Sequence, residues 1–529
     1  MCRGTTLDAS QRPRPRSCPG RDDHEPKGIM TTNDDELTTQ HERLPSLGMA
    51  ILPIVLTLGV LGLQIFYYQD FSPHIPLLIG IALTGLLGAH LGMKWLDVRA
   101  GIFHVIHVSM PSLAILIIVG LLIGVWIASG TVPTLIYYGL TILSPKIFLP
   151  AAMLVCALVS ISLGTSWGTV GTVGLALMGI GAGFEVPMVW TAGAVVSGAF
   201  FGDKMSPLSD TTNLAPAVTG ITVFEHIRNM MPTAIPSMLI ALVIYSIAGW
   251  NMVGDGDASF ETITVLTSTL QENFVISPIT LLPVVVVLGL ALAKKPPLPS
   301  LFLGGVIGGI IAMAMQGAGL HDVFVYAQDG YTIASGNDDI DTLLNRGGIQ
   351  SMMRTISLML LALGFGGALE STGVLERILT AVISPMKRFG SLQATAIGTA
   401  FATNVVAGDP YISIALPGRM YAPVYRGLGY STKNLARAVE EGGTMMSPLI
   451  PWNAGGAFVI TALGLGIMDG HLENLMYIPL SFVCWLSPVI GMFYGFTGLF
   501  SPRATDEEKA GWAENDESVK DVELELETA

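Results

Sequence analysis

The chain has 529 residues, of which 51% are hydrophobic and only 12% are charged. Soluble domains carry about 25% charged residues, so this composition excludes a water-soluble enzyme, a disordered protein and a coiled coil. The net charge of −14 is concentrated in the acidic segments 504–529, 251–275 and 318–349. The apolar runs are continuous rather than alternating, which predicts an all-α polytopic membrane protein and not a β-barrel.

The first 43 residues are polar and lack the layout of a cleaved signal peptide. We expect a disordered cytoplasmic tail, with the alternative that Met30 is the true start of the protein. Ten apolar runs of spanning length follow in chain order, at 45–67, 74–93, 101–128, 147–163, 232–250, 276–293, 299–316, 352–370, 389–403 and 474–497. Four further runs, near 168–184, 188–202, 411–425 and 454–470, are interrupted by Gly, Pro or polar residues.

Together these runs predict about 10 to 13 membrane crossings. Basic residues at Lys94, Arg99, Lys294 and Lys295 and in the segment 426–437 mark the cytoplasmic side by the positive-inside rule. Both termini are then cytoplasmic, and the acidic segments 251–275 and 318–349 lie outside.

The chain contains an internal repeat. The phrase Met-Ser-Pro-Leu occurs at 205–208 and again at 446–449, and Ser129-Gly130-Thr131 resembles Thr372-Gly373-Val374. Polar breaks follow a long apolar run in each half, at 164–168 and 403–410. The charge-derived orientation makes the two copies inverted, an arrangement in which paired broken helices meet at the bilayer midplane.

This repeat divides the chain into seven parts. They are a cytoplasmic tail (1–43), an N-terminal helix pair (44–100), the first inverted repeat (101–231), linking helices with acidic outer loops (232–349), the second inverted repeat (350–473), the last helix (474–500) and an acidic cytoplasmic tail (501–529). Deleting that last tail from Thr505 onward is expected to spare transport.

The segment 198–213 places two carboxylates and a lysine between apolar runs. Ionised side chains at membrane depth cost several kcal/mol each and persist where they pair, line a cavity or bind a ligand. Gly202 and Pro207 interrupt the helix and free carbonyl groups. Asp203 and Lys204 are alternatively an ordinary solvated pair in a cytoplasmic loop.

The sequence predicts four breaks, at 164–168, 203–213, 403–410 and 443–453. The candidate ion- and proton-binding residues lie at them: Asp203, Asp210, Asn213, Thr165, Ser166, Asn404, Asp409, Thr444 and Asn453. Oxygen donors of this kind suit a hard cation, and we place Na+ at Asp210, Asp203 and Asn404. Supporting roles are assigned to Lys204, Glu440, Glu441 and Arg419. Alternatives remain for several of these: packing for Thr165 and Ser166, turn initiation for Asp409, and a helix-end charge facing Arg437 for one of the two glutamates.

A desolvated carboxylate in such a site is protonated more easily, whereas a bound cation favours its charged form. Proton and cation therefore compete for one group. If the site faces one side of the membrane at a time, this competition alone yields antiport.

These motifs resemble the NhaC family of Na+/H+ antiporters, within the wider ion-transporter superfamily. The resemblance rests on Gly202 to Pro216, Gly164 to Thr169, Gly408 to Met420 and Ser447 to Asn453, and covers roughly residues 45–500. One departure is Pro410, where the family often has Gln after Gly-Asp. The resemblance implies a secondary transporter of the bacterial inner membrane that extrudes Na+ or Li+ in exchange for protons.

The alternative within the same resemblance is an organic-anion exchanger of the malate/lactate type, coupled to Na+ and H+. A channel and an intramembrane aspartyl protease are further alternatives, although neither Gly202-Asp203 nor Gly408-Asp409 has the first glycine of a GxGD motif. No enzymatic activity, cofactor or nucleic acid is expected, and no phosphate-binding GxxxxGK[ST] run is present in the sequence. The expected partners are Na+ or Li+, protons, the lipid bilayer and, for the alternative, small organic anions; a homodimer is compatible with the sequence.

Overall fold

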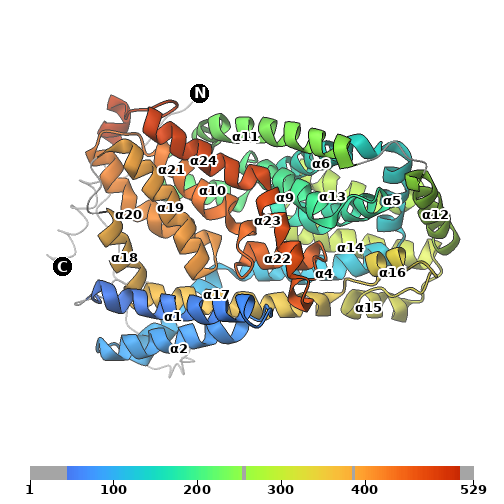
Figure 1. The fold of residues 1–529 in the computed structure, drawn as a ribbon, viewed down its shortest axis with the longest axis horizontal. Helices are drawn as coiled ribbons and strands as arrows, with labels where there is room; N and C mark the ends of the chain where they lie inside the picture. The colour runs from blue at the N-terminus through green and yellow to red at the C-terminus, as the bar shows by residue number, and fades with distance from the viewer. Residues whose placement is uncertain (1–43, 253–257, 384–387, 513–529) are drawn as a thin grey trace, which may run out of the picture. The chain divides into compact units, whose positions relative to one another are not determined.

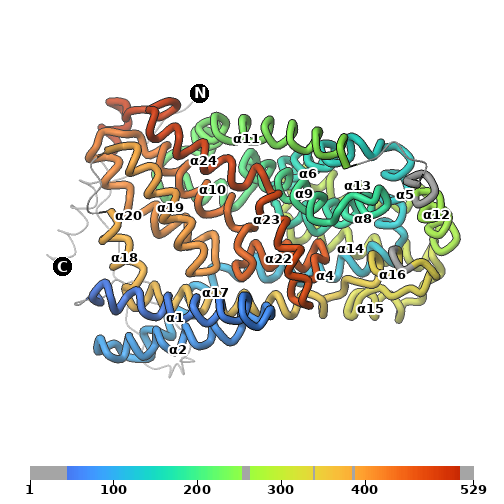
Figure 2. The backbone as a smooth tube through the Cα atoms, in the orientation of Figure 1, coloured from blue at the N-terminus to red at the C-terminus, as the bar shows by residue number. Residues whose placement is uncertain are grey.

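The structure is a computed structural model that describes residues 44–252, 258–383 and 388–512, and the regular elements of these residues are helical (Figures 1 and 2). The described residues belong to one compact unit. The N-terminal tail, the segments 253–257 and 384–387 and the distal tail 513–529 lie outside the described residues, so the expectations for Met30 and for a disordered tail do too.

The chain begins with α1 (Leu47–Phe66) and α2 (His74–His90), which pack on each other. In addition, α2 packs on α17 and α1 packs on α18. The predicted single run 101–128 is divided into α3 (Trp95–Val108) and α4 (Met110–Ala128). Pro111 stands in the first turn of α4, where its missing N–H costs nothing. A continuous helix through this point would lose a hydrogen bond at the proline, so the chain breaks at Ser109.

The first repeat continues through α5 (Thr131–Ile142), η2 (Pro145–Ile147), α6 (Phe148–Leu163), α7 (Ser166–Thr169), the π-helical η3 (Val170–Gly174), α8 (Leu175–Gly183), α9 (Met188–Lys204) and α10 (Asp210–Thr219). The second copy consists of α17 (Ile349–Ser371), α18 (Val374–Ile383), α19 (Phe389–Ala407), α20 (Pro410–Gly427), α21 (Lys433–Glu440), the π-helical η5 (Glu441–Met445), η6 (Ser447–Leu449) and α22 (Ala454–Ala462).

The linking part contains α11 (Val223–Met252), α12 (Ala258–Asn273), η4 (Pro278–Leu281), α13 (Leu282–Leu292), α14 (Pro297–Met315), α15 (Leu320–Asp329) and α16 (Asp338–Leu344). The chain closes with η7 (Ile467–Asp469), η8 (Leu472–Met476), α23 (Tyr477–Leu480) and α24 (Phe482–Thr497). In Figure 1, α11 and α24 run beside each other, and they are in contact.

The two copies of the sequence repeat also have similar backbone conformations at their helix ends. Gly130, between α4 and α5, has a φ of 76°, and Gly373, between α17 and α18, has a φ of 68°. Gly164 after α6 and Gly408 after α19 both have a φ of 67°. These left-handed positions favour glycine because a Cβ atom is strained there. The paired breaks that the sequence predicts at 164–168 and 403–410 therefore share one local geometry.

Helix packing repeats as well. A Cβ atom on Gly202 of α9 would lie 2.3 Å from the carbonyl oxygen of Ala157 on α6, and one on Gly442 of η5 would lie 2.2 Å from that of Ile397 on α19. Both helix pairs thus need glycine to bring their backbones together. The halves also meet directly, since Trp167 of α7 stacks on Phe458 of α22 with ring centroids 5.0 Å apart.

The exterior of the described part is apolar. Among its large hydrophobic side chains, Phe66 is 82% exposed, Leu292 71% and Leu158 68%. In water such patches favour aggregation, whereas in a bilayer they contact lipid. Six described helices are long and apolar enough to cross a membrane, or up to eight if two bent helix pairs count as one span each. The predicted total of about 10 to 13 crossings also counts segments that the breaks divide into shorter helices.

Candidate functional site

Each helix that follows a break begins with a polar capping side chain. Thr165 accepts a hydrogen bond from the backbone N–H of Gly168 (3.3 Å), and Asp409, its counterpart, accepts from Tyr411 (2.8 Å) and Ile412. Ser209 and Asn453 cap α10 and α22 in the same way. Caps of this kind satisfy the free N–H groups of a helix start. The breaks are therefore stable features of the fold and place polar side chains inside it.

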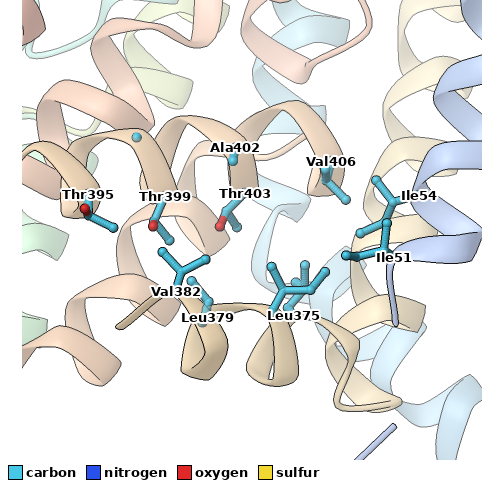
Figure 3. A pocket seen from close by; sticks show the side chains of 12 residues that line it. Ile51, Ile54, Leu375, Leu379, Val382, Thr395, Thr399, Ala402, Thr403 and Val406 are labelled. Carbon is cyan, nitrogen blue, oxygen red and sulfur yellow. The ribbon is translucent and has the colours of Figure 1, made fainter. Parts of the chain in front are cut away.

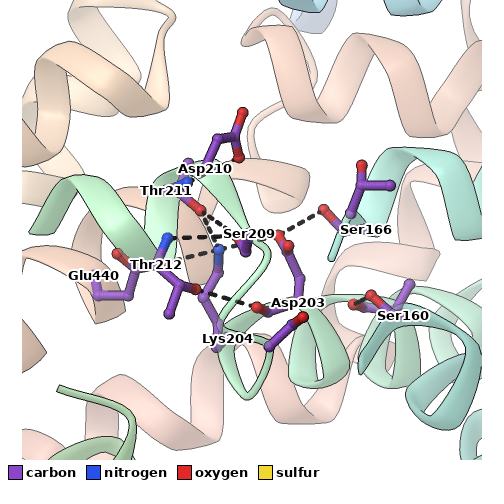
Figure 4. Close-up of polar contacts among 12 residues, drawn as sticks. Ser160, Ser166, Asp203, Lys204, Ser209, Asp210, Thr211, Thr212 and Glu440 are labelled. Atoms are coloured by element: carbon purple, nitrogen blue, oxygen red, sulfur yellow. Dashed lines mark hydrogen bonds and ion pairs between the residues drawn. The ribbon is translucent and has the colours of Figure 1, made fainter. Parts of the chain in front are cut away.

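The break after α9 contains a buried ionic triad (Figure 4). The Nζ atom of Lys204 lies 3.0 Å from Oδ2 of Asp203 and 2.9 Å from Oε1 of Glu440. Lys204 and Glu440 are fully buried, and Asp203 is 4% exposed. Asp203 and Lys204 end α9, while Glu440 comes from α21 of the other half. The solvated-pair alternative for Asp203 and Lys204 is therefore wrong.

Hydroxyl groups surround this triad. Ser166, at the start of α7, donates to Oδ2 of Asp203 (3.0 Å), and Lys204 donates to the hydroxyl of Thr211 on α10 (2.6 Å). Thr212 donates to the backbone carbonyl of Asp203. Ser166 therefore contacts the charged centre directly. One oxygen of each acid, Oδ1 of Asp203 and Oε2 of Glu440, has no hydrogen-bond partner among the described residues.

A second carboxylate group joins the two halves at α10 and α20. The hydroxyl of Tyr411 donates a short hydrogen bond to Oδ2 of Asp210 and lies 3.2 Å from the Ser112 hydroxyl. Asp409 is 2% exposed and accepts from the hydroxyl of Ser109 (3.0 Å) through Oδ2 while its Oδ1 caps α20. Asp409 therefore caps α20 with one oxygen and contacts Ser109 with the other, so it does more than initiate a turn. Asp210 differs from Asp203 in being exposed.

The break of the second half is built from neutral amides. Asn453 donates to both the side-chain and backbone oxygens of Asn404, and Asn404 donates to the carbonyl of Gly443. Ser447 donates to Oδ1 of Asn453 (2.6 Å). Asn404 and Asn453 are fully buried. Amide and carbonyl oxygens at this depth suit a desolvated cation, although this group carries no charge of its own.

The remaining predicted residues lie around these groups or away from them. Thr444 lies beside the Glu440 carboxylate, and Glu441 points to a separate place beside α24. Asn213 donates to the carbonyl of Pro207 (2.9 Å) and closes its own loop. The Arg419 side chain is 65% exposed and lies 3.8 Å from Glu370. Neither Asn213 nor Arg419 contacts the triad.

Sequence reasoning missed five residues that the fold brings to these groups: Ser109, Ser112, Thr211, Tyr411 and Ser447. Thr211 and Ser447 stand inside motifs that the sequence singled out. Pro111 was a signal for a break at Ser109, because proline favours the first turn of a helix. Tyr411 also stands inside such a motif, Gly408 to Met420, but nothing local indicates its partner Asp210, which is 201 residues away.

A cavity of about 380 Å³ lies elsewhere, between α1, α18 and α19 (Figure 3). Its lining is almost entirely apolar and includes Ile51, Leu375 and Val406. Thr399 is one of its few polar members, and its hydroxyl is bonded to that of Tyr421 (2.8 Å). With no ionisable side chain in its wall, this cavity does not suit a small cation.

Lipid-compatible helices, paired breaks and a buried ionic triad define the class of this molecule, a multi-pass membrane transporter. The model of the Na+/H+ antiporter family matches residues 198–499, which include the triad and the amide group. The chain belongs to this family.

The relatives of this chain include several kinds of antiporter. The Na+/H+ antiporter NhaC of Alkalihalophilus pseudofirmus is 37% identical over 87% of this chain and 97% of its own length. The malate-2H+/Na+-lactate antiporter of Bacillus subtilis is 35% identical over 87% of this chain and 96% of its own. The arginine/ornithine antiporter ArcD of Halobacterium salinarum is 35% identical over 89% and 97%.

Proposed function

We propose that this protein is a Na+(Li+)/H+ antiporter of the bacterial inner membrane that extrudes Na+ in exchange for protons by alternating access. The ionic triad carries this proposal. Two carboxylates and one ammonium give Asp203, Lys204 and Glu440 one excess negative charge when all three are ionised. Uncompensated charge in a buried site costs several kcal/mol. One Na+ or one proton removes the excess, so the two compete for the same place.

The unpartnered oxygens support this proposal. Oδ1 of Asp203 and Oε2 of Glu440 are buried acceptors without a hydrogen bond in the described part of the chain. Buried polar atoms nearly always have a partner, and a cation or a proton supplies one. Asp210, which is exposed, serves as the first oxygen that an entering cation meets, and Asp409 and the amide oxygen of Asn404 add further donors.

The family likeness fits this proposal without fixing the substrate. NhaC of A. pseudofirmus is a Na+/H+ antiporter and is 37% identical to this chain. Relatives at 35% identity exchange organic molecules, namely malate and lactate or arginine and ornithine. An organic-anion exchanger coupled to Na+ and H+ is therefore the second candidate, and the exposed guanidinium of Arg419 beside Glu370 is the feature that favours it.

The orientation remains part of the proposal. The positive-inside bias places both termini in the cytoplasm, with the two repeats inverted and their breaks at the bilayer midplane. A homodimer is compatible with this arrangement. The exchange itself requires ion gradients and no chemical conversion, so we propose no enzymatic step.

The proposal is tested in inside-out vesicles that carry an imposed pH gradient. Adding Na+ or Li+ should dissipate the gradient, whereas K+ should not, and malate or lactate added alone should have no effect. Asp203→Asn should abolish the response, because it removes the excess charge. Asn213→Ala, outside the triad, serves as a matched control for expression and insertion. A response to malate but not to Na+ would replace the proposal with the organic-anion exchanger.

A further inference from the structure

Two adjacent glutamates at the junction of α21 and η5 have opposite surroundings. Glu440 is paired with Lys204 of α9 at 2.9 Å. Glu441 is equally buried but points toward α24, where the Ser487 hydroxyl lies 3.5 Å from its Oε1. Its other oxygen, Oε2, has no hydrogen-bond partner among the described residues. The two carboxylates therefore belong to different environments.

The Glu441 carboxylate lies in a recess that fits it closely. A Cβ atom on Gly491 of α24 would lie 2.0 Å from Oε2 and 2.8 Å from the carboxyl carbon. Any larger residue at this position would displace the carboxylate. Thr233 of α11 faces it from another side. The fold thus holds a fully buried acid in a fitted recess between α11, α24 and η5.

A basic side chain in the neighbourhood of Glu441, Arg437 of α21, does not form an ion pair with it. No ion pair within 4.0 Å joins Glu441 to a basic group in the described ranges. Arg437 is fully buried and donates to the carbonyl oxygens of Phe500 (3.0 Å) and Asn229 (3.4 Å) through Nη1. Its Nε and Nη2 atoms have no hydrogen-bond partner among the described residues.

The other titratable groups around this recess come from four elements: Glu440 from α21, His226 from α11, Tyr425 from α20 and Tyr494 from α24. Tyr425 donates to Gln393 (2.8 Å) and Tyr494 to the carbonyl of Pro232, so both hydroxyls are already used. His226 lies near Lys204 and Arg437. None of these groups neutralises the Glu441 carboxylate in this conformation.

We propose that Glu441 is a second proton-binding site of the transporter, separate from the ionic triad, and that it carries a proton in the conformation seen here. An ionised carboxylate without a basic partner is costly in a buried recess, whereas the neutral acid is not. Arg437 lies four residues before Glu441 and hence near the same helix face. A rearrangement that pairs them would ionise Glu441 and release its proton to water.

This inference rests on the proposed antiport and assigns part of the proton binding and release to Glu441. The test uses purified full-length protein in lipid nanodiscs. Proton release on addition of Na+ is followed with a pH indicator in weakly buffered solution, and binding of radioactive Na+ is measured in parallel. The wild type should release protons, and its Na+ affinity should fall as the pH falls, by up to about tenfold per pH unit while one proton competes.

The decisive variants are Glu441→Gln and its neighbour Glu440→Gln. Glu441→Gln should keep Na+ binding within about threefold but release fewer protons per bound Na+ than the wild type, because only the proton that competes at the triad remains. Glu440→Gln should weaken Na+ binding itself, because it removes a charge from the triad. If Glu441→Gln releases as many protons as the wild type, Glu441 is not a proton site.

Gly491→Ala provides a second test of the Glu441 site if Glu441→Gln fails to fold. Its methyl group would displace the Glu441 carboxylate, so proton release should fall while the acid itself remains in the chain. Unchanged release in Gly491→Ala would overturn the assignment. If the wild type releases no proton on Na+ addition at any pH, the antiport proposal fails instead, independently of Glu441.

Discussion

The two halves of the repeat share a backbone plan but differ in chemistry. In both, a helix ends at a left-handed glycine, Gly164 or Gly408, and the next begins at a polar cap. The break after α9 carries the acidic Asp203 and the basic Lys204, whereas the equivalent break after η5 carries the neutral amide Asn453. The scaffold of these two breaks is thus duplicated, and their ionisable groups are not.

This difference separates the groups that stabilise the helix breaks from the groups that exchange ions. Amide and hydroxyl groups satisfy free backbone groups without changing their charge between mildly acidic and alkaline pH. Carboxylates change charge when a proton or cation arrives. We therefore expect substitutions in the amide group to alter stability and cation binding uniformly with pH, and substitutions in the triad to alter the pH dependence itself.

The largest effect is expected from Lys204→Met. It leaves the carboxylates of Asp203 and Glu440 buried without a counter-charge, and breaking a buried ion pair in this way costs about 3–5 kcal/mol of unfolding free energy. Exchange should be lost as well. Stability in detergent and vesicle exchange are the measurements. The double variant Lys204→Met with Glu440→Gln should recover part of the stability; a loss below about 1 kcal/mol in the single variant would contradict a tightly coupled triad.

A smaller effect is expected from Asn453→Ala at the break after η5. The variant removes the cap of α22 and takes away the partner of the Ser447 hydroxyl and of the side-chain oxygen of Asn404, which together cost about 1–3 kcal/mol. Exchange should decrease by a similar factor at every pH, since no titrating group is removed. Ser209→Ala, the matched cap of α10, should cost about 1 kcal/mol. A shifted pH profile of exchange in Asn453→Ala would contradict the view that the amide group after η5 has no part in the pH dependence.

Tyr411→Phe tests the contact between the halves. It removes the hydrogen bonds to Asp210 and Ser112, which are worth about 1 kcal/mol, so the apparent KM for Na+ should rise about 3- to 10-fold with kcat little changed. Tyr421→Phe is the control, because its hydroxyl is bonded to Thr399 instead. An unchanged KM in Tyr411→Phe would remove Asp210 from the cation path.

The smallest effect is expected at the C-terminal segment. Glu508 lies 2.8 Å and Glu225 3.0 Å from Lys433, and both raise the pKa of Lys433. Because this pKa is raised, the stabilisation is complete below the pKa of a free lysine and is lost only as the pH rises through the folded value. These pairs are half-buried near the surface, and surface ion pairs are worth about 0.2–1 kcal/mol. Lys433→Gln should therefore lower stability slightly and equally across neutral pH, as measured by thermal unfolding.

Truncation of the C-terminal segment also tests how much its contacts contribute to stability. The proximal tail is attached to the body, with Arg503 4.0 Å above the Tyr430 ring and Arg426 5.4 Å from the Trp512 ring. Removing residues 513–529 should leave exchange unchanged. Deletion from Thr505, which the sequence alone predicts to spare transport, also removes Glu508 and Trp512 and should lower stability while sparing most transport. Equal stability of the two truncated proteins would mean that these contacts contribute nothing measurable.

The sequence by itself determined the class of fold, the repeat and the position of the breaks. Continuous apolar runs predict membrane helices, and Gly164 and Gly408 mark the ends of α6 and α19, because these signals are local. The motif 202–213 likewise identified Asp203 and Lys204 as costly residues at membrane depth. Their partner Glu440 was assigned only a supporting role, since it lies 236 positions later in the chain.

Only the tertiary structure decided which polar residues share a site. Ser109 reaches Asp409 across 300 residues and Tyr411 reaches Asp210 across 201, distances over which spacing carries no information. It also separated Glu440 from Glu441, which are neighbours in sequence but point to Lys204 and to Gly491 respectively. The physical reason is that a buried charge is stabilised by whatever packs against it, and packing between helices is not a local property of the chain.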